Sequence, residues 1–214
     1  MRMVQGLPLM GMTKWEYKHD RILATAAALF SERGFTGVAV DQVAERAGVS
    51  KATVYRHFKD KETLFVEVVT HLCRDAGVRD MELNYDEPDH ALRFIGLEFC
   101  RRFNHPLIRS LFLTVAASAR SIPKVGDLFW ATGPGYGFEV IKNILARLRV
   151  NHPDVDVELD EGAWMFLGAV SGRQMLELMS GKDALVDERE LEMRVAKVVS
   201  CFLRGIGYVP KADQ

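Results

Sequence analysis

The amino-acid sequence predicts an all-α protein with a small amino-terminal domain and a larger carboxy-terminal one. Apolar residues recur at helical spacing along most of the 214 residues. Alternating β-branched runs bounded by turn residues, the pattern of strands, are nearly absent. The polar segment 84–89 (NYDEPD) contains a proline and is the best internal boundary between the two domains.

Four helical segments are expected before this boundary. The first helix should end at Gly34, a residue suited to a helix C-cap. Short helices at about 40–47 and 51–57 flank a turn at Gly48, and a longer helix begins after Asp60, a good N-cap. The apolar face of the first helix consists of Ile22, Ala26, Leu29 and Phe30.

A glycine-rich run interrupts one of the helices expected in the larger domain. The run GPGYG at 133–137 has no strand before it and no Lys-Ser/Thr pair after it. We therefore interpret it as a kink or break in a helix, not as a phosphate-binding loop. The expected helices cover about 91–104, 106–120, 124–150, 159–180 and 187–205.

The composition is that of an ordinary globular protein, with 48% apolar and 27% charged residues. The formal net charge is −1, so any nucleic-acid site must be a local feature. Three distant cysteines argue against a disulfide framework or zinc knuckle and favour the cytoplasm. The six histidines are scattered, so we expect no metal and no cofactor. No membrane span is expected, and residues 1–13 are interpreted as a mobile tail.

The segment from Val40 to Phe65, VDQVAERAGVSKATVYRHFKDKETLF, has the residues that two short helices crossing at a tight turn require. Ala44 is small where the helices approach each other, and Gly48 can adopt the positive φ angle of the turn. Ser50 can N-cap the second helix, so that its amide-rich end faces a phosphate. The small shared core would contain Val43, Val49 and Val54.

The outward face of the second short helix is polar and basic. Between Lys51 and Lys61 there are four basic residues and one acid, a local balance of +3. Groups at the start of such a helix hold DNA phosphates, and groups at its middle reach base edges in the major groove. The segment is therefore predicted to be a helix-turn-helix that reads DNA, with Lys59 and Lys61 on the phosphate backbone.

The same stretch closely resembles the tetracycline-repressor (TetR) family. AERAGVSKATVYRHFKDKETLF at 44–65 matches the signature of that family nearly position by position, and RILATAAALFSERGF at 21–35 matches the preceding segment. Beyond about the first quarter of the chain, the resemblance is one of helical character and length. It implies a dimeric repressor with a three-helix DNA-binding head and a helical ligand-binding body whose last two helices form the dimer.

The resemblance implies a turn shaped by Gly48 and five DNA contacts, by Lys51, Thr53, Tyr55, His57 and Lys61. The chain departs from the family where Val38 and Ala39 replace hydroxyl residues before the first short helix, and Thr36 is the expected substitute. The full set expected at the DNA is Thr36, Ser50, Lys51, Ala52, Thr53, Tyr55, Arg56, His57, Lys59 and Lys61. The expected domains are the tail (1–13), the head (14–60), a connecting helix (61–83) and a ligand-binding and dimerisation domain (84–214).

The last two expected helices are apolar on more than one face. The segment GAWMFLGAV at 162–170 is apolar nearly all round, and the final helix has an apolar stripe. Packing against a second copy would cover both faces, whereas an entirely intramolecular core is the alternative. Two-fold symmetry would match a palindromic operator with half-sites about 34–36 Å apart. The residues expected at the dimer interface are Trp164, Leu167, Val195, Val199 and Phe202.

Aromatic and methionine residues are concentrated in the middle helices. Each is more often plain core, but together with a kink at Pro134 they favour a cavity for a small, largely apolar effector. The residues expected to line it are Phe99, Phe103, Phe112, Trp130, Tyr136, Trp164 and Arg173.

These patterns predict a DNA-binding transcriptional regulator that is not an enzyme. We expect an effector to shift the helix at 61–83 and release a repressor from its operator, although the sequence does not distinguish repression from activation. The rival interpretation is a helical protein-interaction module, or an enzyme, that has lost DNA binding. An enzyme would need an acid–base pair inside the cavity, and none is evident.

Overall fold

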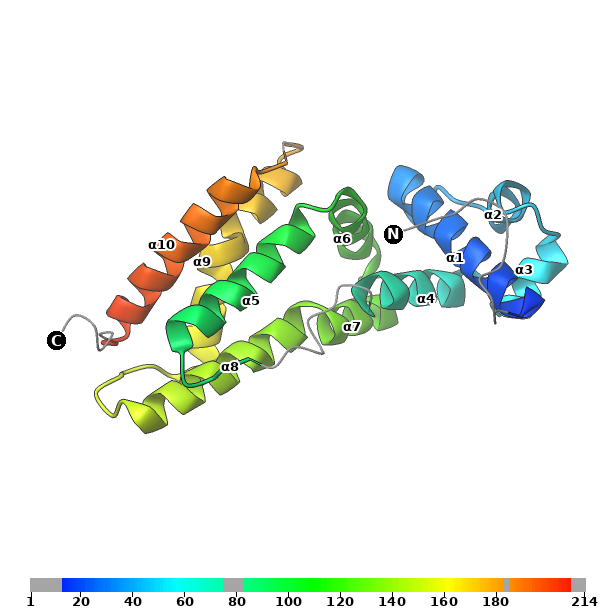
Figure 1. Ribbon diagram of the computed structural model, residues 1–214. Coiled ribbons are helices and arrows are strands. Elements are labelled where there is room, and N and C mark those ends of the chain that lie inside the picture. The colour runs from blue at the N-terminus through cyan, green and yellow to red at the C-terminus, as the bar shows by residue number, and fades with distance from the viewer. Residues whose placement is uncertain (1–12, 75–82, 183–184, 209–214) are drawn as a thin grey trace. The chain divides into compact units, whose positions relative to one another are not determined.

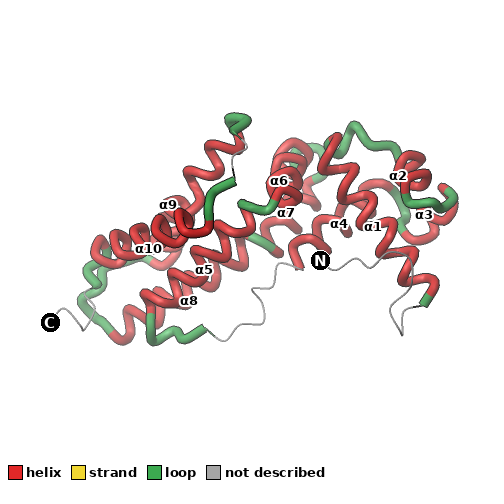
Figure 2. The backbone as a smooth tube through the Cα atoms, turned by 45° about the horizontal axis from the view of Figure 1, so that its top comes forward, coloured by secondary structure: helices red, strands yellow, loops and turns green. Residues whose placement is uncertain are grey.

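The computed structural model describes residues 13–74, 83–182 and 185–208, and every regular element in these ranges is an α-helix. Figure 2 shows these helices joined by loops. The predicted all-α fold class is therefore confirmed. The helices are α1 (Lys14–Arg33), α2 (Val40–Arg46), α3 (Lys51–His57), α4 (Lys61–Arg74), α5 (Pro88–Phe103), α6 (Pro106–Ser118), α7 (Pro123–Thr132), α8 (Pro134–Asn151), α9 (Leu159–Met179) and α10 (Glu188–Gly205).

Local capping residues set several of these boundaries. Thr63 N donates to Asp60 Oδ1 at 2.7 Å, so Asp60 caps α4 as the sequence predicts. Thr13 forms a capping box with Glu16 at the start of α1, with Glu16 N donating to Thr13 Oγ1 at 3.2 Å. Thr13 therefore belongs to the first helix and not to the expected tail, whose other residues lie outside the described part of the chain.

Prolines determine where two helices of the larger domain begin. The expected helix at 124–150 breaks at Gly133, and Pro134 starts the new helix α8. Pro88 starts α5 before the expected position 91. A proline suits the first helical position because its fixed φ angle is already helical and the N–H that it lacks would have no intrahelical acceptor.

The described residues divide into two compact units. The head unit contains the described residues up to Leu72 together with Ser110–Leu128, and the body unit contains the described residues between Cys73 and Arg109 and those from Phe129 onward. The expected boundary at residue 84 therefore assigns 110–128 to the wrong domain. These residues belong with the head because Ser110 Oγ donates to Ser31 O and Thr114 Oγ1 donates to Phe30 O at 3.3 Å. The two hydroxyls thus bind carbonyls in the last turn of α1, and Phe30 O also accepts from the C-cap N–H of Gly34 at 2.9 Å.

Aromatic rings fill the centre of the head. The Phe65 side chain, on α4, is fully buried and its ring centroid lies 5.0 Å from those of Phe30 and Phe35. The Phe30–Phe65 pair meets edge to face, a favourable arrangement of aromatic quadrupoles. This cluster fixes α4 against α1. Within the described residues α4 ends at Arg74, and Leu83 lies in a loop, so Leu83 is not part of the expected connecting helix 61–83. Residues 75–82 lie outside the described part.

The body packs α5, α8, α9 and α10 around one apolar core. In Figure 1 α5 runs between α8 and α10. Each of these three helices also contacts α9. A Cβ atom added at Gly96 of α5 would lie 3.0 Å from Val195 Cγ1 and 3.4 Å from Phe166 Cζ, so glycine permits the close approach of these helices. No described helix is both long enough and apolar enough to span a membrane. The best-buried core residues include Leu92, Ile141, Ile144, Leu145, Phe166 and Val199.

Candidate nucleic-acid interface

A tight turn joins α2 to α3. Gly48 has a φ angle of +60°, as the sequence predicts, and Val49 N donates to Ala44 O at 3.0 Å across the turn. Arg21 Nη2 of α1 donates to Gly48 O at 3.0 Å. A Cβ atom at position 48 would find ordinary space, 3.6 Å from Arg21 Nη2, so the backbone conformation is what favours glycine.

The two short helices are capped by different means. Thr53 N donates to Ser50 Oγ at 3.2 Å, which makes Ser50 the predicted N-cap of α3. Ala39 precedes α2 and has no side-chain cap, but its N–H donates to Gln42 Oε1 at 3.0 Å. The N–H of Gln42, from which a hydroxyl at position 39 would accept, donates instead to Ala39 O at 3.1 Å, and Thr36 is exposed in the turn that follows α1.

One face of α3 is buried against the head and the other is open to solvent. Val54 is 1% exposed, and it packs in a small core that includes Val43 and Ala44 of α2. The open face is continuous with Lys59, just beyond the helix end. Its exposed residues are Lys51, Ala52, Tyr55, Arg56 and Lys59, which we call the α3 open face. A helix that presents cations, a methyl group and a phenol to solvent has the chemistry to bind phosphates and base edges.

Three residues expected at the DNA are instead engaged inside the head. Thr53 is only 8% exposed, because Thr53, Val54 and His57 fall on the stripe of α3 that faces inward. The ring of His57 stacks on Trp15 of α1. Lys61 Nζ lies 4.3 Å from the ring centroid of Phe35, and burial lowers the pKa of Lys61. The structure therefore does not place these three side chains on the α3 open face.

Lys51 is held by an acidic residue of the neighbouring helix. Lys51 Nζ lies 2.9 Å from Asp41 Oδ1, and this hydrogen-bonded pair raises the pKa of Lys51. Both side chains are more than half exposed, so solvent screens the pair. Sequence spacing does not predict this pair, the Arg21 contact to the turn or the Trp15 contact to His57, because each joins separate elements of the chain.

Replacing Asp41 with asparagine is expected to strengthen binding to duplexes of any sequence. Lys51 would then reach a phosphate without leaving a carboxylate, and one repulsive charge would be removed. We expect Kd at low salt to fall about two- to fivefold, a range typical of exposed ion pairs. Fluorescence anisotropy with a labelled mixed-sequence duplex measures it. Glu45→Gln, on the same helix, is the charge-matched control, and an equal gain in that variant would show a general charge effect.

Comparison with known proteins identifies the family to which this head and body belong. Residues 22–68 match the family profile described as bacterial regulatory proteins of the tetR family. Residues 90–206 match the profile described as the C-terminal domain of AefR-like transcriptional repressors, and this match covers more than half of the chain. The chain belongs to the TetR family. The family is one of transcriptional regulators and not of enzymes, which confirms the resemblance seen in the sequence.

Curated relatives of this TetR-family protein match mainly its head. The HTH-type transcriptional repressor NicS of Pseudomonas putida is 34% identical over 76 residues, which are 35% of this chain and 36% of that protein. The HTH-type transcriptional regulator AcrR of Shigella flexneri is 36% identical over 75 residues, 34% of each protein. The chain thus spans about a third of the length of these relatives.

Solved structures match nearly the whole TetR-family chain. The flavonoid-responsive regulator FrrA is 26% identical, with a TM-score of 0.71 over 88% of this chain and 96% of that one. A TetR-family regulator from Mesorhizobium loti is 23% identical, with a TM-score of 0.69 over 91% of this chain and 98% of that one. The second likeness shows the fold alone.

Four of the five residues expected at a dimer interface lie inside the body of a single TetR-family chain. Leu167 is 6% exposed, Val195 1%, Val199 0% and Phe202 9%, and all four are part of the core. Their assignment to the interface is therefore wrong, because the stripe to which they belong packs α9 and α10 against α5 and α8. Trp164 is 51% exposed and remains available to a partner.

The residues expected to line an effector pocket are also only partly brought together. Phe99 and Tyr136 line a small cavity in the body, and Phe103 lies next to Phe99 with ring centroids 5.4 Å apart. Trp130 and Trp164 stack on each other and are 41% and 51% exposed. Phe112 belongs to the head unit. Arg173 is exposed and pairs with Glu177 and Glu190. Trp130, Trp164, Phe112 and Arg173 therefore do not line the cavity.

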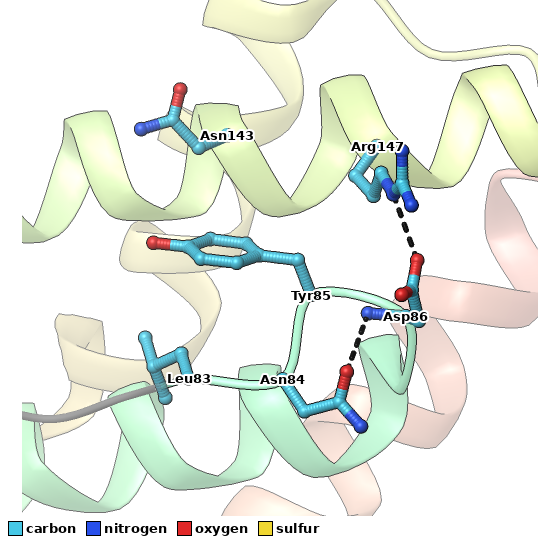
Figure 3. A pocket seen from close by; sticks show the side chains of 6 residues that line it. All are labelled: Leu83, Asn84, Tyr85, Asp86, Asn143 and Arg147. Atoms are coloured by element: carbon cyan, nitrogen blue, oxygen red, sulfur yellow. Dashed lines mark hydrogen bonds and ion pairs between the residues drawn. The ribbon is translucent and has the colours of Figure 1, made fainter.

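A second, open groove lies beside α8 in the body of the TetR-family protein. Figure 3 shows Tyr85 directed toward α8, between Leu83 and Asn143. Arg147 Nε donates to Asp86 Oδ1 at 2.7 Å, and Asp86 N donates to Asn84 Oδ1 at 3.1 Å. These polar groups form hydrogen bonds with one another on an exposed surface. Among the described residues, no cluster of His, Cys, Asp or Glu could hold a metal ion.

Proposed function

We propose that this TetR-family protein is a cytoplasmic transcriptional repressor that binds a palindromic operator as a homodimer through the α3 open face. The observation that carries this proposal is the arrangement of Lys51, Ala52, Tyr55 and Arg56 on the exposed side of a capped helix that follows a glycine turn. Such a helix fits the major groove of DNA. The family match and the repressor NicS among its relatives support the repressor assignment.

Each residue of the α3 open face has a chemical role in this proposal. Lys51, at the start of the helix, would hold a phosphate, as would Lys59 just beyond its end. The methyl group of Ala52 would contact a thymine methyl group, and the Tyr55 phenol would reach a base or phosphate. Arg56 is a forked donor suited to a phosphate or to guanine O6 and N7.

The homodimer is proposed on a corrected face of α9 and α10. The large apolar side chains that are more than half exposed on these helices are Trp164, Met165, Leu176, Met179 and Met193. Between them lie Gly168 and Gly172, where an added Cβ atom would meet nothing within 4 Å. An apolar surface of this extent on paired helices is typical of a subunit interface, and glycines permit close packing of the partner. We call these seven residues the α9/α10 outer face.

An effector is proposed to bind at the body cavity lined by Ile95, Phe99, Arg102, Gly133, Tyr136 and Gly137. The cavity volume is about 10 Å³, which is room for roughly one water molecule. A ligand must therefore widen it, and the break between α7 and α8 at Gly133 is where the backbone can yield. The lining favours a small aromatic ligand. If a broad panel of aromatic compounds shifts neither the melting temperature nor DNA affinity, this part fails.

Selection from a pool of randomised duplexes by the full-length protein tests the proposal. The expected result is enrichment of a palindrome whose half-sites lie about one helical turn, 34–36 Å, apart. A reporter gene placed behind the selected site should be silenced by the protein. No enrichment would favour the rival interaction module, and enrichment of a single unpaired half-site would contradict the homodimer.

A further inference from the structure

The last turn of α3 is attached to the start of α1 by a stack of rings. The Trp15 and His57 ring centroids lie 3.7 Å apart, with planes inclined by 25°. Next to them the rings of His19 and Phe58 are stacked at 4.8 Å. Trp15 is 49% exposed, so the indole covers His57 and still leaves about half of its own surface open. An exposed tryptophan next to a DNA-reading helix is a feature that the sequence analysis did not single out.

The same indole lies beside a cation of the α3 open face. Arg56 Cζ is 5.9 Å from the ring centroid of Trp15, within the range of a cation–π contact. The hydrogen bond that Arg56 makes inside α3, from Nη2 to Thr53 Oγ1, is long at 3.4 Å. The Trp15 ring and the buried Thr53 hydroxyl are therefore two fixed contacts that limit where the Arg56 guanidinium points.

His57 contributes to this stack through the flat face of its ring and not through hydrogen bonds. Both ring nitrogens are buried, and neither has a hydrogen-bond partner among the described residues. Burial lowers the pKa of His57, and positive charge nearby has the same effect: His19 and Lys18 of α1 and Arg56 of α3 face the ring. Glu67 of α4 lies 3.5 Å from His19 and not beside His57. A neutral imidazole whose two ring nitrogens are buried does not act as a phosphate ligand in this arrangement.

We propose that Trp15 is a positioning residue of the DNA-binding head, which stacks on His57 and supports Arg56 and thereby fixes the direction in which the last turn of α3 meets DNA. The proposal rests on DNA contact by the α3 open face. It assigns DNA affinity to a residue outside the helix-turn-helix, and it reverses the expected role of His57 from a DNA contact to a packing partner.

Binding of the selected operator by full-length variants tests this role. Trp15→Ala removes the ring and should weaken binding about three- to tenfold, whereas Trp15→Phe keeps a ring and should restore most of the affinity. His57→Phe keeps the stack and should bind like the wild type. Because Trp15 acts through Arg56, the double variant Trp15→Ala/Arg56→Ala should bind no more weakly than Arg56→Ala. Trp15→Leu, which keeps apolar bulk without a ring, replaces Trp15→Ala if the latter loses helical circular dichroism.

The pH profile gives a readout that a merely structural role would not move. The neutral His57 ring packs in the head, so its contribution is fully present above the ordinary histidine value of about 6.5 and is lost as pH falls through the lowered value. Wild-type affinity should therefore decline on acidification below about pH 6.5, and the decline should be smaller in His57→Phe. A decline that persists unchanged in His57→Phe would contradict the role of His57.

The outcomes separate this role from the proposed function. If Arg56→Ala leaves operator affinity unchanged, DNA contact by the α3 open face fails at Arg56 and the positioning role falls with it. If Arg56→Ala weakens binding but neither Trp15→Ala nor Trp15→Leu does, only the positioning role is overturned. If His57→Phe weakens binding and Trp15→Ala does not, His57 is a DNA contact after all.

Discussion

Replacing Gly168 of α9 with arginine is expected to convert the protein from dimer to monomer and to abolish tight operator binding. An added Cβ atom at position 168 meets nothing within 4 Å in the single chain, so the chain itself should accommodate the new side chain. In the proposed dimer, however, the guanidinium would be forced into the apolar contact between the two α9/α10 outer faces, and burying a charge in an apolar contact is costly. Two heads that are no longer joined lose their shared binding to two half-sites, a loss of about a hundredfold or more.

Sedimentation equilibrium and operator titration measure the two effects of Gly168→Arg separately. Ala116→Arg adds the same charge at an exposed position of α6 and should leave both the mass and the affinity unchanged. If Gly168→Arg remains a dimer and binds the operator with wild-type affinity, α9 is not part of the dimer interface. A monomer that still binds the full operator tightly would show that the two heads do not need each other.

Replacing Phe65 with alanine is expected to unfold the head while the body remains folded. Phe65 is fully buried, and its ring meets Phe30 and Phe35 at 5.0 Å, so the substitution leaves a large cavity. Such truncations of buried phenylalanine cost about 3–5 kcal/mol. A small domain is stable by only about 5–15 kcal/mol in total, so this loss removes much of the stability of the head.

Scanning calorimetry should show the consequence of Phe65→Ala as an early transition that is absent from the wild type. The body should keep its own transition, because its core residues belong to a separate unit. Phe65→Leu retains most of the side-chain volume and should cost less than about 1.5 kcal/mol. A single unfolding transition whose midpoint temperature falls in Phe65→Ala would show that the head and the body unfold together.

Local sequence signals were sufficient to predict most helix boundaries. Ser50 and Asp60 cap their helices with hydrogen bonds that span three residues, and Pro134 starts α8 through its own fixed φ angle. Each of these signals acts within one turn of a helix and can be read from neighbouring residues. The positive φ angle of Gly48 is also a local requirement, which is why the helix-turn-helix was visible in the sequence.

The sides of the helices that face the core could not be predicted with the same accuracy. On α9, Leu167 points into the core and Met165 is 61% exposed, yet both are apolar. Helical spacing gives two apolar faces there without saying which one packs inside the chain, because that depends on how α5 and α8 approach. For this reason the sequence pattern places four residues of the inner face at the dimer interface.

The details of the DNA site depend in the same way on contacts between helices. The sequence predicts a basic face on α3, but Lys51 is paired with Asp41 from α2 and His57 is covered by Trp15 from α1. Residues 10 and 42 positions apart in the chain meet only after the helices have packed. A sequence pattern identifies the residue types of such a site, whereas tertiary packing selects the ones that face the DNA.

The dependence of operator affinity on salt in Lys51→Ala tests the central claim, that the α3 open face binds DNA, most directly. Each phosphate contact contributes about −0.9 to the slope of log K against log salt concentration, so the variant should lose about one unit of slope. Its affinity should fall to a similar extent on the selected operator and on a mixed-sequence duplex, since a phosphate contact carries no sequence information. An unchanged slope together with unchanged affinity for both duplexes would contradict the claim.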